Sequence, residues 1–273
     1  MEMISAAKLR RVQNAMEAAR PYAAKVQQLV AHLALSEAAA GQPLFVQREG
    51  GRLTVVVMAS DRGLCGGYNA AVLRLAEEFI RSNGGKGAVD VFAVGRRARD
   101  FLRKRGYKVF DSKISLGGRV QSELSNSIAN MMAARFLNGE TDRVVLIYNS
   151  FVSAIAYKAV ATQFLPLSAE EAPHRKEEEI AHDYNVQVDY IFEPSARRVF
   201  EALLPRYVQT KVHAAMLEAM TTEHIARRIA MNSATENSGE MIRSLSLKAN
   251  KARQAGITKE ILEIVGGAEA LKG

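Results

Sequence analysis

The chain has 273 residues, 48% hydrophobic and 24% charged, a composition typical of a folded protein with one core. Lys and Arg exceed Asp and Glu by 8 and the pI is near 9.6, which favours an anionic partner: nucleic acid, a membrane surface or an acidic protein face. The single cysteine, Cys65, excludes an intrachain disulfide, and no apolar run suits a membrane span or a signal peptide, so we expect neither.

Residues 1–39 predict a long amphipathic helix. Its apolar positions are Met3, Ala7, Val12, Met16, Ala23, Val26, Val30 and Leu33. Pro21 lies inside this helix and lacks a backbone donor, so we expect a bend there. The helical pattern is already complete at Met1, with no capping residue before it, from which we expect a further segment upstream.

The middle of the chain alternates between strands and helices. Residues 53–59 form a continuous apolar run, typical of a strand buried on both faces of a parallel sheet. The expected strands are 53–59, 88–94, 108–110, 143–149, 155–165 and 187–192, and the expected helices are 70–81, 96–105 and 121–137. This order predicts a mostly parallel sheet with helices packed on it, while the charged residues 168–183 predict a solvated loop.

After a short helix that ends at Pro205, residues 206–270 predict one helix about 90 Å long, which must project from a domain of this size. Its seam has coiled-coil spacing. The seam positions are Val208, Val212, Ala215, Ala219, Ala226, Ile229, Ser233, Met241 and Leu245. Many of these are small, so each turn buries little area and the coil is slender.

The predicted fold class is therefore α/β. A Rossmann-like, mostly parallel sheet domain (41–194) is inserted between two long terminal helices (1–40 and 195–273), which form an antiparallel coiled coil.

A glycine-rich loop follows the first strand and invites a phosphate-binding interpretation. Gly63, Gly66 and Gly67 match neither the dinucleotide nor the P-loop spacing, so a tight strand-to-helix turn is favoured. Asp61 and Arg62 are interpreted as a local cap or ion pair.

No metal or nucleophile site is expected from the histidines and the cysteine. Only His174 and His182 lie near each other in sequence, without metal-ligand spacing. Cys65 has no acid or oxyanion donor placed beside it, so we interpret it as a small buried apolar residue. Two alternatives remain for the whole chain. A nucleotide-binding α/β enzyme would bind nucleotide by itself, and a nucleic-acid-binding coiled coil would bind duplex DNA with steep salt dependence.

Several segments resemble the gamma-subunit family of F-type ATP synthases, and together they span nearly the whole chain. They are SDRGLCGGYN at 60–69, FEPS at 192–195, LLPRYV at 203–208, EHIAR at 223–227, ANKARQAGITKEI at 249–261 and GGAEAL at 266–271. The resemblance implies a central-stalk rotor. It implies that the terminal helices lie inside a ring of alternating alpha and beta subunits, and that the α/β domain is the foot on the membrane rotor ring and the epsilon subunit.

The resemblance further implies that flow of protons or sodium ions turns this subunit, so that it presents a changing face to each beta subunit. It implies a non-catalytic subunit with no cofactor and no metal. It also implies a peripheral position on the cytoplasmic face of the bacterial plasma membrane, reached only through the complex, and no nucleic-acid partner.

The family's contact residues carry over by position. Arg253 and Gln254 fall on an Arg-Gln pair that engages a catch loop of a beta subunit, and Thr258 and Glu260 lie in the adjoining block. Tyr190 and Glu193 fall on the foot segment near the rotor ring and epsilon.

Two departures from the family pattern are visible. Residues 1–11 resemble a segment that lies about two dozen residues inside the family's usual start, so we expect an upstream start and, in the antiparallel pair, Met1 near Glu240. Ala249 stands where the family usually has an aromatic residue.

Overall fold

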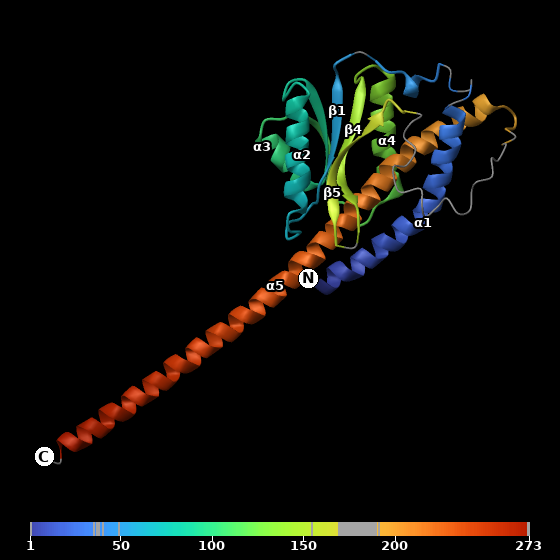
Figure 1. Ribbon diagram of the computed structural model, residues 1–273. Coiled ribbons are helices and arrows are strands. Elements are labelled where there is room, and N and C mark those ends of the chain that lie inside the picture. The colour runs from blue at the N-terminus through green and yellow to red at the C-terminus, as the bar shows by residue number, and fades with distance from the viewer. Residues whose placement is uncertain are drawn as a thin grey trace.

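The computed structural model describes residues 2–34, 36, 39, 41–48, 50–153, 155–168, 190 and 192–271. An α/β domain lies at one end, and helix α5 (Ala196–Ala270) projects far beyond it (Figure 1). The predicted loop 168–183 and strand 187–192 fall almost wholly outside the described residues, and the described positions among them are neither helix nor strand.

The domain is built on one five-stranded sheet with the order β3-β2-β1-β4-β5. The strands are β1 (Leu53–Met58), β2 (Val89–Val94), β3 (Val109–Lys113), β4 (Arg143–Phe151) and β5 (Tyr157–Leu165). β1 pairs in parallel with β2 and β4, β2 pairs in parallel with β3, and only β5 runs antiparallel, at the edge beside β4. The prediction of a mostly parallel sheet is confirmed.

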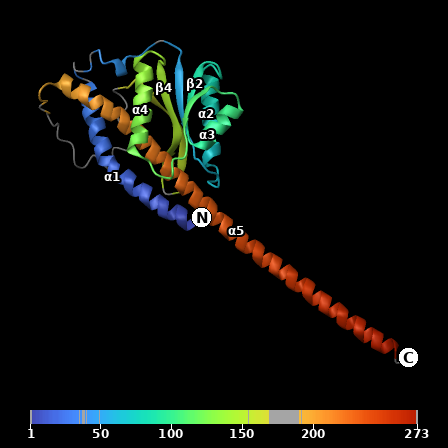
Figure 2. The same ribbon diagram turned by 180° about the vertical axis from the view of Figure 1, so that it is seen from behind.

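Helices cover both faces of the sheet (Figures 1 and 2). They are α1 (Glu2–Ala34), α2 (Tyr68–Ser82), α3 (Arg96–Lys104) and α4 (Ser122–Leu137), with a short 3-10 turn, η2 (Pro43–Phe45), after α1. Val55 and Val57 of β1 pack in the cluster under α2 and α3, whereas Val56 and Met58 pack in the cluster shared with α1, α4 and α5. Alternate side chains of β1 therefore enter two cores, as a strand buried on both faces requires.

α1 and α5 form the predicted antiparallel pair, with Val12 and Met16 against Leu217 and Met220. From Val12 onward the predicted seam of α1 is correct, and α1 changes direction partway along its length (Figure 1), consistent with a proline inside it. In the first two turns of α1 the predicted seam is wrong. Met3 is 85% exposed and Ala7 is exposed, while Ser5 and Leu9 are buried. Steps of three and four back from Val12 lead to Leu9 and Ser5, so the seam keeps its spacing through a polar residue.

The predicted start of the long helix at residue 206 is wrong. α5 begins at Ala196, where the Ser195 hydroxyl oxygen accepts a hydrogen bond from the backbone N–H of Arg198 at 3.4 Å. Pro205 is an interior residue of α5. Phe200 and Tyr207, buried on either side of it, keep the backbone helical despite a cost of about 3 kcal/mol for an interior proline.

The paired region ends earlier than the sequence suggested. Val12 of α1 shares one buried cluster with Met220 of α5, and Met16 with Leu217, which gives the register of the antiparallel pair. Continuing this register, Glu2, ten residues before Val12, lies at about the level of Ala230, so the pair ends before Glu240. Met1, which was expected near Glu240, lies outside the described residues. The last buried residue of α5 is Ala226, and residues 232–271, called the rod below, are exposed almost throughout.

Candidate interaction surface

The rod carries an unusual amount of bare apolar surface. Its exposed apolar residues are Met241, Ile242, Leu245, Leu247, Ile257, Ile261, Leu262, Ile264, Val265 and Leu271, each at least half exposed. No other described segment of the chain packs on them. Exposed apolar surface on this scale marks a binding surface for another macromolecule.

The centre of the rod is basic. Between Glu240 and Glu260 it has no acidic residue, and it carries Arg243, Lys248, Lys251, Arg253 and Lys259. Only Lys259 is in a described ion pair, with Glu263 one turn along at 3.7 Å. Exposed apolar side chains together with a basic centre suit a partner that combines apolar and acidic groups.

The structure places the four predicted beta-subunit contacts together on the rod. Arg253, Gln254, Thr258 and Glu260 are all exposed, within about two helical turns of one another. The Thr258 hydroxyl donates to the backbone carbonyl of Gln254 at 2.9 Å, a bond within the helix. Arg253 and Glu260 have no described ion-pair partner, so both charges are available to another chain.

Tyr190 and Glu193 lie at the opposite end of the molecule, beside the start of α5. The Tyr190 hydroxyl accepts a hydrogen bond from Lys25 Nζ at 2.8 Å, and its ring meets the edge of His32 with centroids 5.7 Å apart. Tyr190 is therefore partly engaged with α1, whereas Glu193 is exposed.

The glycine-rich loop holds α5 where it leaves the domain. The Tyr68 hydroxyl donates to the carbonyl of Ala219 at 2.8 Å, and Arg227 Nη2 donates to the carbonyl of Gly63 at 3.4 Å. Gly66 has φ +54°, a left-handed conformation that favours glycine, which confirms a tight turn. Cys65 is buried against Tyr68, as predicted.

Asp61 is a cap, as its sequence context suggested. Its Oδ1 accepts from the backbone N–H groups of Arg96 and Ser115, both at 3.0 Å, and its Oδ2 accepts from that of Leu116 at 2.7 Å. One carboxylate thus joins the loops after β1, β2 and β3.

Titratable groups are buried beneath this junction. Burial raises the pKa of Glu223, against the opposing effect of Arg227, whose Nη1 lies 2.7 Å from its carboxylate. Burial, assisted by Arg227 and Lys8, lowers the pKa of His224 to about 4. Neither ring nitrogen of His224 has a hydrogen-bond partner among the described residues, so the neutral ring is retained at neutral pH.

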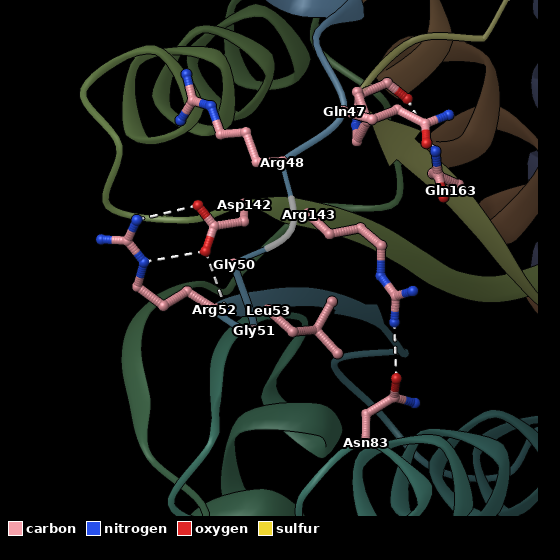
Figure 3. Close-up of a pocket in the computed structure, with 11 residues that line it drawn as sticks. Gln47, Arg48, Gly50, Gly51, Arg52, Leu53, Asn83, Asp142, Arg143 and Gln163 are labelled. Carbon is pink, nitrogen blue, oxygen red and sulfur yellow. Dashed lines mark hydrogen bonds and ion pairs between the residues drawn. The ribbon is translucent and has the colours of Figure 1, made fainter.

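A polar pocket of about 450 Å³ opens at the other end of the sheet, beside the first residues of β1 and β4 (Figure 3). The Arg52 guanidinium forms a two-point pair with Asp142, with Nε and Nη2 each 3.0 Å from a carboxylate oxygen, and this pair lowers the pKa of Asp142. Arg143 donates to Asn83 Oδ1 at 2.7 Å. A Cβ on Gly50 would overlap the Asp142 carboxylate, so this loop requires glycine.

The sequence prediction did not include this pocket. Arg48, Arg52 and Arg143 come from segments up to 95 residues apart, and no local pattern links them. The only local signal is the pair Gly50-Gly51 directly before a strand.

Two other kinds of site are absent from the described residues. No cluster of three or more His, Cys, Asp or Glu side chains there could hold a metal ion. None of the helices there is both long and apolar enough to span a membrane. His174 and His182 lie outside the described residues.

Comparison with known proteins identifies the family. The ATP synthase family model matches residues 1–271. The chain is 43% identical to the ATP synthase gamma chain of Desulforamulus reducens over 272 residues, covering 100% of this chain and 92% of that one. It is 42% identical to that of Moorella thermoacetica, with the same coverage.

The fold is also similar to a chain of the central stalk and c-ring of the Tetrahymena thermophila mitochondrial ATP synthase, with a TM-score of 0.64 and 23% identity over 86% of this chain and 97% of that one. A sheet domain with a projecting helix is thus shared with a solved rotary stalk. The chain therefore belongs to the gamma-chain family of ATP synthase, whose members are central-stalk rotor subunits.

Proposed function

We propose that the rod turns inside a ring of alpha and beta subunits, and that the α/β domain is the foot that couples it to the membrane rotor ring and to epsilon. The observation that carries this proposal is the rod itself: an exposed helix over residues 232–270 with many exposed apolar side chains and a basic centre. A helix of this length without packing is stabilised mainly by partners, which a surrounding ring would supply.

Arg253 and Gln254 engage a loop of a beta subunit in this proposal, and Thr258 and Glu260 extend the same contact. The basic centre of the rod suits acidic side chains on that loop. Gly239 and Gly256 support a close approach, since a Cβ at either position would meet no atom within 4 Å apart from its own stretch of helix. Each glycine costs the helix about 1 kcal/mol relative to alanine, a cost that contact with another backbone would justify.

At the foot, Glu193 is an exposed group that faces the rotor ring and epsilon, and Tyr190 lies beside it in contact with Lys25 of α1. In the assembled complex this chain then lies on the cytoplasmic face of the membrane. The terminal helices and residues 41–194 act as stalk and foot respectively. The chain supplies no catalytic group, because the glycine-rich loop that could have held phosphate serves to hold α5.

Assembly of two chain lengths tests this function. The full chain and a version ending at Asn232 are each co-expressed with alpha and beta subunits, and the complexes are purified through a tag on beta. We expect the full chain to co-purify and support ATP hydrolysis, and the shortened chain to be folded but absent from the complex. Equal assembly of both, or failure of a folded full chain to assemble, would contradict the proposal.

A point substitution tests the proposed contact between Arg253 and a loop of a beta subunit. Arg253→Ala should lower ATP turnover coupled to rotation without changing the melting temperature of the subunit, because the side chain has no described contact in the chain. Arg243→Ala, which removes an equal charge about three turns away, is the matched control and should have the smaller effect. Unchanged turnover in Arg253→Ala would count against the beta-loop contact.

A further inference from the structure

A second charged surface lies at the end of the domain where the parallel strands begin. Helices that connect parallel strands run back along the sheet, so the last residues of α2 and α3 reach this same end. The surface is formed by Arg48 before β1, Lys86 between α2 and β2, Arg103 and Lys104 in the last turn of α3, and Arg143 at the start of β4. We call these five residues the strand-start surface.

None of these five side chains is in an ion pair with a described residue. Nearby basic side chains do form ion pairs: Arg52 pairs with Asp142, and Lys108 pairs with Asp90 at 2.8 Å. Glu49, next to Arg48, lies outside the described residues. The C-terminal dipole of α3 accounts for part of the preference for Arg103 and Lys104, but not for Lys86, Arg48 or Arg143.

The polar pocket is part of this surface, and its arginines retain unused donors. Arg48 uses Nη1 to donate to the carbonyl of Phe136, at 2.6 Å, and Arg143 uses Nη2 for Asn83. A guanidinium has five N–H groups, so each arginine uses one of them in a described hydrogen bond and has others left over. The Arg48 guanidinium also lies over the Phe136 ring, 4.5 Å from its centroid. In Figure 3 the guanidinium groups of Arg48, Arg52 and Arg143 point in different directions. That spread suits several phosphate groups in a layer better than one chelated anion.

The position of the strand-start surface also favours phosphate groups arranged in a layer. The strand-start surface lies at the end of the molecule away from the tip of the rod, the end at which α1 finishes and α5 begins (Figure 1). If the rod enters the catalytic ring, this end faces the membrane.

We propose that the strand-start surface binds the phosphate groups of acidic phospholipids, giving the foot a direct contact with the bilayer in addition to its attachment through the complex. This inference rests on the proposed orientation of the foot. The attraction is electrostatic, acts within about one Debye length of 8 Å at physiological ionic strength, and weakens as salt rises.

Flotation of the full chain with vesicles tests this contact. The vesicles are pure phosphatidylcholine or phosphatidylcholine with about 30% phosphatidylglycerol, a charge density at which basic clusters bind. The test variant carries K86Q, R103Q and K104Q together, all at exposed side chains. The matched control removes three exposed charges at the opposite end of the domain: R62Q, R96Q and R97Q together. Both triples retain the rod, so binding through the rod contributes equally to both.

We expect the chain to float with acidic vesicles only and to be released by salt. The first triple should weaken binding on the order of 10- to 100-fold, and the control triple far less. Equal weakening by both triples, binding that ignores lipid charge, or competition by soluble polyglutamate stronger than by acidic vesicles would each overturn the proposal. The last outcome would assign the surface to an acidic protein. Inorganic phosphate that displaces the chain more than chloride of equal ionic strength would show a free-phosphate site and also overturn it. Assembly with alpha and beta, measured separately, reports on the rotor function alone.

Discussion

The two halves of α5 share one helix but depend on different interactions. Residues 196–226 lie in the core. Phe200 and Val212 are fully buried, in the same apolar cluster as side chains from one face of the sheet. In the rod, Leu247 is 72% exposed and no described residue packs on it. Helical conformation alone therefore does not distinguish the halves. The first half determines whether the domain folds, and the second is free to serve an interface.

The largest expected effect separates the halves by stability. Phe200→Ala should lower the free energy of unfolding by about 3–5 kcal/mol, because it empties a fully buried site. Leu247→Ala should change it by less than about 0.5 kcal/mol while weakening assembly with alpha and beta. Urea unfolding of both variants measures the difference. A comparable loss in the two would mean that the rod packs on the domain in solution.

The packed half should also make the stability of the fold depend on pH. The pKa of His224 is lowered to about 4 in the fold, so below its ordinary value of 6.5 the unfolded chain gains a proton that the folded chain resists. Stability from this group is complete above pH 6.5 and declines, by at most about 3 kcal/mol, as pH falls toward 4.

Glu223, whose pKa is raised, acts in the opposite direction over part of this range, so the comparison must be between variants. His224→Leu should flatten the fall in melting temperature between pH 6.5 and 4 relative to the unmodified chain. A parallel fall in both would show that His224 is accessible to protons in the folded state.

The contact between the loop and α5 should have an intermediate effect. Tyr68→Phe removes one of two side-chain donors to the buried carbonyl of Ala219, which the Thr222 hydroxyl still reaches at 2.9 Å, and should cost about 1–1.5 kcal/mol. Tyr157→Phe, at a partly exposed ring in the same cluster, is a control with a smaller expected cost. Thermal unfolding of the isolated chain distinguishes them, and equal losses would argue against the Tyr68 hydrogen bond as the main anchor.

The smallest effect tests the rod itself and should change sign on assembly. Gly256→Ala should stabilise the free helix by about 1 kcal/mol, measured as helicity by circular dichroism, because the site is open in this chain. In the complex the added methyl group should weaken binding if a partner backbone approaches there. Tighter assembly of the alanine variant would show that the glycine is merely tolerated.

Most of the architecture could be predicted from the sequence because the apolar periods were strong. The buried run at β1 and the alternation of strands and helices indicated the parallel sheet, and the three-four spacing indicated the α1–α5 pair. The start of α5 could not be predicted because a proline usually ends a helix or lies in its first turn. Here the cap at Ser195 and the core contacts around Pro205 keep Pro205 inside the helix. The end of the pair was misplaced because register depends on which side chains meet, such as Val12 and Met220.

The candidate interaction sites could likewise be predicted only in part. The four rod positions came from resemblance, and the structure shows that they are exposed, while their contacts with a beta subunit stay a prediction. The strand-start surface could not be predicted from the sequence, because Arg48 and Arg143 are brought to the same pocket only by the parallel pairing of β1 with β4.

The core beneath the sheet has a mechanical consequence. A single apolar cluster contains residues of α1, α4, α5 and the strands, including Val30, Ile128, Val56 and Val212. α5 could rotate about its own axis against the domain only by withdrawing these side chains from one another and exposing them to water. A torque applied to the foot is therefore delivered to the base of the rod without slippage, and any twist must arise in the bare helix beyond.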